Sequence, residues 1–145
     1  MAICTFFGHS ECYDLDAKIL QNAIVQLICQ GVDTFYVGNQ GQFDRTVYRC
    51  LKMLRTKYPH IRIFVVLAYL PTREQECGDI EDTMYPEIEG HPKFAIERRN
   101  KWMIKQSDLC LCYVNRTWGG AYKFVCIAKR QGLEIINLGA IELAE

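Results

Sequence analysis

The sequence has no excess of charge of either sign. Its 145 residues include 17 basic and 17 acidic side chains, which gives a formal net charge of zero at pH 7. General attraction to DNA, RNA or an anionic membrane surface depends on a basic excess. We therefore expect no such partner, and an anionic ligand would have to be held by local groups.

Long apolar runs are also missing. A helix that spans a bilayer needs about 20 consecutive apolar residues, and no segment of the sequence approaches that length. The start of the chain, from Met1 to Phe7, carries neither the basic residues nor the small-residue cleavage site of a secretory signal. These features predict a cytoplasmic protein without membrane contact.

Closely spaced cysteine pairs of the CxxC type are absent, although the chain has eight cysteines. Buried thiols in a reducing compartment explain this usage better than disulfides do. We assign Cys110 and Cys112 to opposite faces of one strand, and so expect no redox pair. The cysteines that lie inside apolar runs are Cys4, Cys29, Cys110, Cys112 and Cys126.

The hydrophobic pattern alternates between strand and helix periods. It predicts an α/β fold: a single Rossmann-like domain over residues 1–145, with a mostly parallel open sheet of about five strands and helices on both faces. Asp14 is the expected N-cap of the first helix, and Gly31 is expected to end it. Strands are predicted at 2–7, 34–37, 61–67, 108–114 and 134–138, and helices at 14–31, 43–58, 92–107 and 120–131.

About twenty residues after the third predicted strand are irregular, polar and acidic. The segment from Glu74 to Glu89 would repel a polyanion, so nucleic-acid binding is not expected. A connection of this length in a small domain usually serves a site. We interpret it as a lid over a small ligand.

Three loops carry glycine at the predicted carboxyl ends of strands, each just before a helix. In open α/β sheets, ligands bind at this edge, where helix N-termini favour phosphate. One such junction alone is usually a tight turn, but three together predict a ligand cradle. The glycines are Gly8 after the first strand, Gly38 and Gly41 after the second, and Gly119 and Gly120 after the fourth.

The familiar nucleotide fingerprints are absent from these loops. The first loop lacks GxGxxG, and no GxxxxGK[ST] segment occurs, which argues against a standard NAD-dependent dehydrogenase and a P-loop nucleotidase. We expect no bound cofactor. His9 has no second histidine, cysteine or aspartate at metal spacing beside it, and so no metal site is expected.

Polar side chains in the second loop, GNQGQFD, suit recognition of a ligand. Asn39 and Gln40 can hydrogen-bond a base, a ribose or a phosphate. Asp44 can accept from a ribose hydroxyl, or simply complement the helix dipole. In the first loop, GHSE, His9 is placed to donate to a phosphate or to transfer a proton.

The loop before Gly119 adds an aromatic and a cation. Trp118 is a candidate for stacking on a base, or packs on the edge of the domain, and Arg116 can pair with phosphate. Lys123, in the first turn of the following helix, can also reach an anion.

Three segments carry a resemblance to a known group: Arg99-Asn100-Lys101-Trp102-Met103, Ser107-Asp108 opening an apolar strand, and Gly119-Gly120 opening a helix. Together they resemble the SLOG superfamily, which includes LOG-like nucleotide phosphoribohydrolases, DprA proteins and small YpsA-like proteins. The run from Asn100 to Leu138 is most similar to the YpsA-like branch. The resemblance implies a Rossmann-like fold that binds nucleotides or nucleotide-derived molecules, such as those of the ADP-ribose type, and a homodimer or tetramer.

The resemblance matches only half of the LOG catalytic pair. Arg99 falls on the arginine of LOG-like enzymes, but Cys126 stands where they carry a glutamate, and a thiol cannot replace a carboxylate in cleaving an N-glycosidic bond. Binding is therefore expected rather than LOG-type hydrolysis. No catalytic residue is assigned, and an enzyme would need another carboxylate, from among Glu11, Asp44, Asp79 and Glu97.

The favoured hypothesis is a module that senses or sequesters a nucleotide-derived small molecule. Two alternatives stay open: a nucleotide N-glycosidic hydrolase, and a protein-interaction domain without a ligand. The residues predicted to bind the ligand are Gly8, His9, Ser10, Gly38, Asn39, Gln40, Gly41, Asp44, Arg99, Asn100, Trp118, Gly119 and Gly120.

Overall fold

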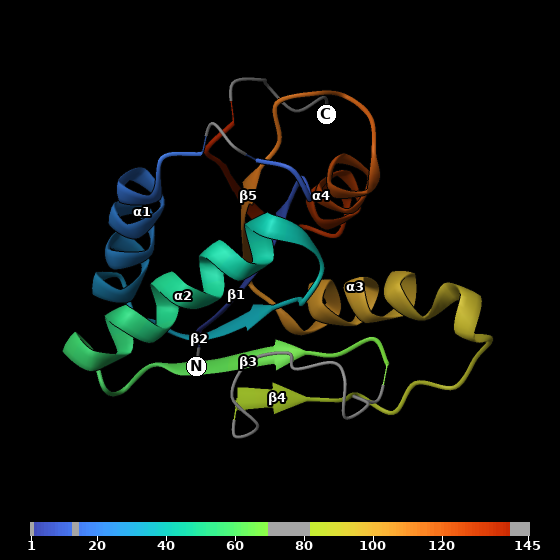
Figure 1. Ribbon diagram of the computed structural model, residues 1–145, viewed down its shortest axis with the longest axis horizontal. Helices are drawn as coiled ribbons and strands as arrows, with labels where there is room; N and C mark the ends of the chain where they lie inside the picture. The colour runs from blue at the N-terminus through green and yellow to red at the C-terminus, as the bar shows by residue number, and fades with distance from the viewer. Residues whose placement is uncertain (1, 13–14, 70–81, 140–145) are drawn as a thin grey trace.

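The computed structural model describes residues 2–12, 15–69 and 82–139, which form one open sheet with helices on both faces (Figure 1). All strand pairs in this part of the chain are parallel, in the order β4-β3-β2-β1-β5-β6. The strands are β1 (Ala2–Gly8), β2 (Val32–Val37), β3 (Arg62–Val66), β4 (Thr83–Met84), β5 (Leu109–Tyr113) and β6 (Glu134–Asn137). The helices are α1 (Ala17–Cys29), α2 (Gly41–Lys57), α3 (Ala95–Gln106) and α4 (Gly120–Arg130).

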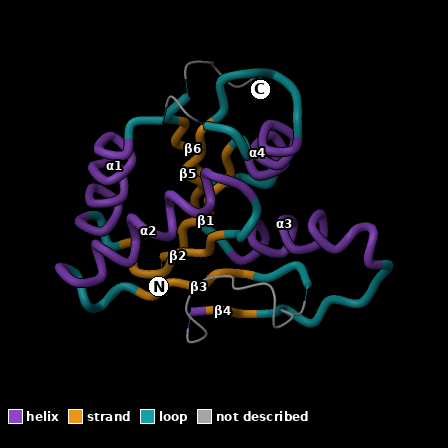
Figure 2. Tube along the Cα trace, viewed as in Figure 1, coloured by secondary structure: helices purple, strands orange, loops and turns teal. Residues whose placement is uncertain are grey.

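Two hydrophobic cores lie on opposite faces of the sheet. Helices α1 and α2 cover one face, where Leu20, Ile24 and Leu51 are fully buried against β1 and β2. Helices α3 and α4 cover the other face, through side chains such as Met103 and Val125. Figure 2 shows these two helical layers with the strands between them. The predicted α/β, Rossmann-like fold is confirmed.

The strand β5 is buried on both faces, and its residues alternate between the two cores. Leu109 and Leu111 belong to the α1–α2 core, whereas Cys110 and Cys112 both belong to the α3–α4 core. The assignment of these cysteines to opposite faces was wrong, because residues two apart on a strand point to the same face. Both thiols are fully buried and free.

The described structure has six strands rather than about five. The extra strand, β4, has only two residues and pairs with Val65 and Val66 of β3.

Two helix starts also differ from the prediction. Asp16, not Asp14, caps α1 by accepting from the Lys18 N–H at 2.9 Å. Asp14 lies outside the described residues, as does most of the segment interpreted as a lid. Residues 92–94 form a 3₁₀ turn, so the α-helix begins only at 95.

The order of the strands determines where a ligand can bind. From β1 the chain adds β2, β3 and β4 on one side, and then crosses to place β5 and β6 on the other. The direction of winding therefore changes between β1 and β5. In open parallel sheets a crevice forms at the carboxyl ends of the strands where this change occurs.

A buried carboxylate fixes the start of β4 to α2. Asp82 accepts two hydrogen bonds from the Arg55 guanidinium, at 2.8 and 3.2 Å, and one from the Tyr48 hydroxyl at 2.8 Å. These partners hold the pKa of Asp82 below its usual value, although burial opposes this. Such a short edge strand has few ladder bonds of its own, and we infer that Asp82 positions it.

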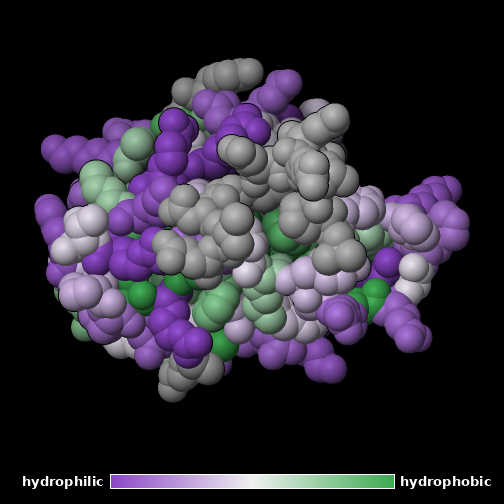
Figure 3. Space-filling model, turned by 60° about the horizontal axis from the view of Figure 1, so that its bottom comes forward, coloured by the Kyte–Doolittle hydropathy of each residue, from purple (hydrophilic) through white to green (hydrophobic). Residues whose placement is uncertain are grey.

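The helices of the described residues can be compared with the length and hydropathy that a membrane span requires. No helix in the described ranges is both long enough and apolar enough to cross a bilayer. On the face shown in Figure 3, hydrophobic residues among those that are coloured form small separate patches between hydrophilic residues.

Substitution Asp82→Asn tests the anchoring of β4. We expect it to lower the free energy of unfolding by about 1 to 3 kcal/mol at neutral pH, because charge-assisted hydrogen bonds to Arg55 are lost. Urea unfolding monitored by circular dichroism measures the change. Because the folded state lowers the pKa of Asp82, its contribution to stability should be fully present above the unfolded pKa and should be lost as the pH falls through the lower, folded pKa.

Glu134 is exposed, so the substitution Glu134→Gln is the matched control and should leave the unfolding midpoint unchanged. Equal stability of the Asp82→Asn variant and the wild type would show that β4 is held by other contacts.

Candidate functional site

A pocket of about 230 Å³ opens at the carboxyl edge of the sheet, where the winding direction changes. Its walls come from the loops after β1, β2 and β5, together with one face of α3 and the first turn of α4. The predicted ligand-binding residues that line it are Gly8, His9, Ser10, Gly38, Gln40, Asp44, Arg99, Asn100 and Gly120.

The first two glycine loops are tied together by their backbones. The Gln42 N–H donates to the Ser10 carbonyl at 2.9 Å. Gly41 has a φ of +88°, and a Cβ atom there would lie 2.7 Å from the Ser10 Cα. Only glycine allows both this conformation and this close approach. Gly41 therefore joins the two loops and does not itself line the pocket.

Asp44 caps the start of α2. Its Oδ2 atom accepts the Gln40 N–H at 2.8 Å, which satisfies one of the free backbone donors at the helix N-terminus. Gly38 leaves room for this arrangement, because a Cβ atom there would lie 2.8 Å from Asp44 Oδ2 and 3.1 Å from the Arg99 guanidinium. This bond gives Asp44 a role at the helix N-terminus, and acceptance from a ribose hydroxyl stays a prediction.

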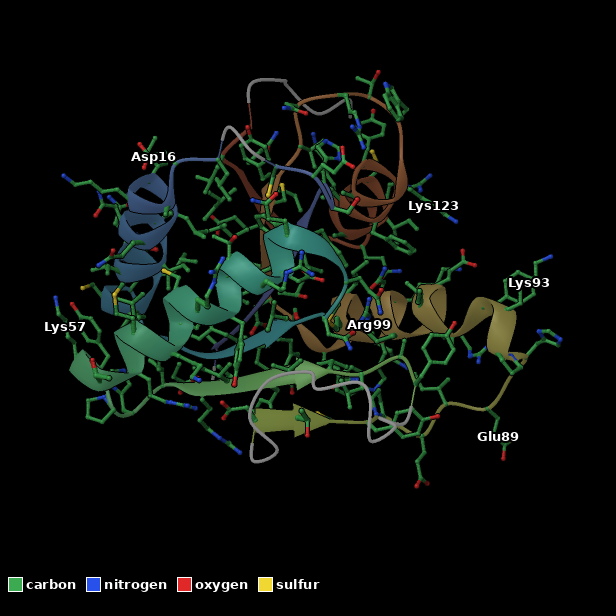
Figure 4. All side chains as sticks on the ribbon, in the orientation of Figure 1. Asp16, Lys57, Glu89, Lys93, Arg99 and Lys123 are labelled. Carbon is green, nitrogen blue, oxygen red and sulfur yellow. The ribbon has the colours of Figure 1, made fainter. Side chains whose placement is uncertain are left out.

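Arg99 is buried, with 3% of its surface exposed. Its Nε atom donates to the Asn100 side chain at 2.8 Å, and its Nη1 atom donates to the Asn39 side chain and the Val66 carbonyl, both at 3.1 Å. These bonds join α3 to the ends of β2 and β3. Figure 4 shows Arg99 on the inner side of α3, whereas Lys123 extends outward from α4. Within the described part of the chain, Nη2 of Arg99 has no hydrogen-bond partner.

Asp44 and Arg99 each shift the pKa of the other within the pocket. Burial raises the pKa of Asp44 to about 6, while the Gln40 hydrogen bond and the positive charges of Arg99 and Arg45 lower it. Burial also lowers the pKa of Arg99, which Asp44 partly offsets. At neutral pH the pocket therefore contains a buried guanidinium that is only partly compensated by a carboxylate.

His9 is fixed as a neutral hydrogen-bond donor. It is 3% exposed, and its Nε2 atom accepts the Asn115 N–H at 3.2 Å. In a neutral imidazole the other nitrogen then carries the proton. Burial and the nearby charge of Arg116 both lower the pKa of His9, which favours this neutral form. Nδ1–H has no partner among the described residues and is a donor at the pocket wall.

Arg116 supplies a second cation at the rim. Its Nε atom is buried without a partner in the described residues, and its guanidinium lies 4.0 Å from the centre of the Trp118 ring. Trp118 is 63% exposed and does not line the pocket; it supports Arg116 by a cation–π contact. Gly119 is the N-cap of α4, whose first turn has neither a side-chain cap nor an acidic residue.

Several residues around the pocket were not predicted from the sequence. On α3, Ile96 and Met103 share a face with Arg99. They lie three residues before it and four residues after it, so helical spacing could have predicted them from the sequence. The first two turns of α4 contribute Ala121 and Phe124 in the same way. The additional apolar lining residues are Phe6, Phe7, Ile96, Met103, Ala121 and Phe124.

Among the carboxylates considered for catalysis that lie in the described ranges, one lines this pocket. Asp44 does so, whereas Glu97 lies outside it, where its side chain binds Lys123 at 2.8 Å and Lys101 at 3.5 Å. Lys123, which was predicted to reach an anion, thus binds the Glu97 carboxylate in this structure. Glu11 is exposed and is not part of the wall, and Asp79 lies outside the described residues.

The pH dependence of stability tests the environment of Asp44. Because its folded pKa of about 6 exceeds the usual aspartate value of 3.8, the folded chain binds this proton more tightly. The wild type should therefore gain stability relative to Asp44→Asn as the pH falls, by about 2 to 3 kcal/mol between roughly pH 7 and pH 4, at about 1.36 kcal/mol per pH unit. Urea unfolding of both proteins across this range measures it.

A difference in stability between the two proteins that does not change with pH would contradict a raised pKa. In Arg99→Gln, carboxyl NMR should show a higher pKa of Asp44 than in the wild type, because a cation that lowers it is removed.

No protein-family model matches the chain, and no curated protein matches it well enough to show a relationship. The likeness to the SLOG superfamily thus stays a prediction from short motifs. In the ranges 2–12, 15–69 and 82–139, no three His, Cys, Asp or Glu side chains gather as they would around a metal ion. What the pocket can bind must be argued from the groups that line it.

Proposed function

We propose that the protein binds a nucleotide or nucleotide-derived small molecule, of the ADP-ribose, NAD or cyclic-nucleotide type, through an anionic group held in the pocket between β1, β2 and β5. The observation that carries the proposal is the convergence of hydrogen-bond donors without partners in the described chain. They are Nη2 of Arg99, Nε of Arg116, Nδ1–H of His9 and the uncapped first turn of α4.

An anion satisfies all of these donors at once. Phosphate oxygens accept from guanidinium groups and from the N–H groups at a helix N-terminus, where the helix dipole adds a favourable field. A buried donor without a partner is costly in a folded protein, and Nε of Arg116 is such a donor within the described residues. Bound phosphate would remove that cost, and this supports an anionic ligand over a neutral one.

Part of the pocket wall is apolar, which suits an organic anion better than a free inorganic ion. Phe7, Met103 and Phe124 line the wall beside the donors. Ligand sites commonly combine apolar walls with a few polar groups that fix the orientation of the ligand. The pocket therefore fits a phosphate attached to a sugar or a similar carbon skeleton, as a sensor or a sequestering module would bind it.

Hydrolysis of the ligand is a second candidate function, favoured by the position of Asp44. This carboxylate lines the pocket, and burial raises its pKa to about 6, within the range useful for proton transfer near neutral pH. In an N-glycosidic cleavage, a water molecule would attack the anomeric carbon and the C–N bond would break. Asp44 would accept one proton of the water, the hydroxyl would stay on the sugar, and the protonated Asp44 would then give its proton to the leaving base.

Binding is tested by thermal shift and calorimetry with AMP, ADP-ribose, NAD and cyclic dinucleotides, and with adenosine as an uncharged comparison. We expect a charged ligand to raise Tm, because ligand at about 100 times Kd adds roughly 2.7 kcal/mol of stability. Arg116→Gln should weaken binding by about tenfold or more, since a charge-assisted hydrogen bond is lost.

Arg130→Gln is the matched control, because Arg130 is exposed at the opposite end of the same helix. It should leave the affinity unchanged. If none of the charged ligands alters Tm, the binding proposal fails and an interaction domain without a ligand becomes the better hypothesis.

Chromatography of the ligand after incubation separates the two candidate functions. A hydrolase would release free base and sugar phosphate, and Asp44→Asn should reduce the rate by about 100-fold or more, the usual range for removal of a general base. Recovery of intact ligand from the wild type would rule out hydrolysis and leave binding.

A further inference from the structure

A second pocket, of about 170 Å³, lies beside the first at the carboxyl edge of the sheet. It is formed by the segments that follow β3 and β4 and by the start of α3. None of the functional residues predicted from the sequence lines this pocket except Arg99, which lines both pockets. The two pockets therefore share one guanidinium group as a common wall.

Flat side chains form much of the second pocket. Tyr69 and Tyr85 are 46% and 37% exposed, which is unusual for large rings that stabilise only a core. The Tyr69 hydroxyl donates to the Pro92 carbonyl at 3.1 Å, so its ring has a fixed position, and Pro86 adds a second proline ring to the lining. Such surfaces bind planar aromatic groups by stacking.

Arg98 provides a cationic surface in the same pocket. Its Nη1 atom donates to the His91 carbonyl at 2.8 Å, and the guanidinium lies against Gly90, where a Cβ atom would be 2.5 Å from Nη1. The Nε atom is buried and has no partner within the described ranges. A guanidinium held in this way offers its face to an aromatic ring, and none of the described lining residues is acidic.

The shared Arg99 relates the two pockets to one ligand. The first pocket offers donors to an anion, and the second offers flat aromatic, proline and guanidinium surfaces. A molecule that occupies both pockets must carry its aromatic ring and its anionic group at opposite ends of a spacer. The spacer would lie beside the Arg99 guanidinium, which lines both pockets. A sugar ring is such a spacer, and a nucleoside phosphate has this arrangement.

We propose that the second pocket is a binding subsite for a planar aromatic ring, of the nucleobase class, carried by the same ligand whose phosphate occupies the first pocket. This inference rests on the proposed function, because the ring is positioned by an anion bound beside Arg99. It assigns recognition of the base to Tyr69, Tyr85 and Arg98, and recognition of the phosphate to Arg99, Arg116 and the start of α4.

The test compares AMP with ribose 5-phosphate, which lacks the base, by calorimetry on the wild type and on Tyr85→Ala. The wild type should bind AMP more tightly. Tyr85→Ala should weaken AMP by about tenfold, the usual effect of removing a stacking aromatic, and leave ribose 5-phosphate unchanged. Tyr85→Phe keeps the ring and should bind AMP as the wild type does.

Phe94→Ala is the matched control, because Phe94 is an aromatic at the start of α3, 49% exposed, that lines neither pocket. Equal loss of AMP affinity in Phe94→Ala and Tyr85→Ala would overturn the inference. So would AMP and ribose 5-phosphate binding with equal affinity, sensitive to Arg116→Gln but not to Tyr85→Ala, and this result would leave the proposed function intact. If neither compound binds, this inference fails, and the proposed function fails with it only if ADP-ribose, NAD and the cyclic dinucleotides do not bind either.

Discussion

The burial of the Arg99 guanidinium is the constraint on which the carboxyl edge of this fold depends. Removing a charged group from water is costly unless its hydrogen bonds are replaced. Here the replacements come from three segments that are distant in sequence: Asn39 after β2, the Val66 carbonyl at the end of β3, and Asn100 on α3. Their convergence fixes the ends of these elements relative to one another and involves the Nε and Nη1 atoms of the guanidinium.

The loops around Arg99 owe their positions to close backbone packing rather than to side-chain bulk. Gly38 and Gly41 allow α2 to start beside the first loop, and Asp44 then caps that helix. His9, in turn, receives the Asn115 N–H, so that the loop after β1 supports the loop after β5. A change in any of these contacts would be felt across the whole pocket, because each loop is held by its neighbour.

Much of the architecture could be predicted from the sequence, because strands buried on both faces and amphipathic helices have distinct periods. The two-residue strand β4 could not, since its pairing with β3 and the bonds of Asp82 to Arg55 and Tyr48 define it, and no local pattern does. The glycine loops were located by their place after strands. The buried Nε of Arg116 and the second pocket required the structure, because they arise from contacts between segments far apart in the chain.

The raised pKa of Asp44 connects the pocket to the proton concentration of its surroundings. An anion that enters beside this carboxylate places like charge near it and raises its pKa further above about 6. At mildly acidic or neutral pH the complex would then take up a proton from solution as it forms. By thermodynamic linkage, acidification strengthens anion binding to the same extent that binding strengthens protonation. The proposed binding of an anion would therefore depend on pH.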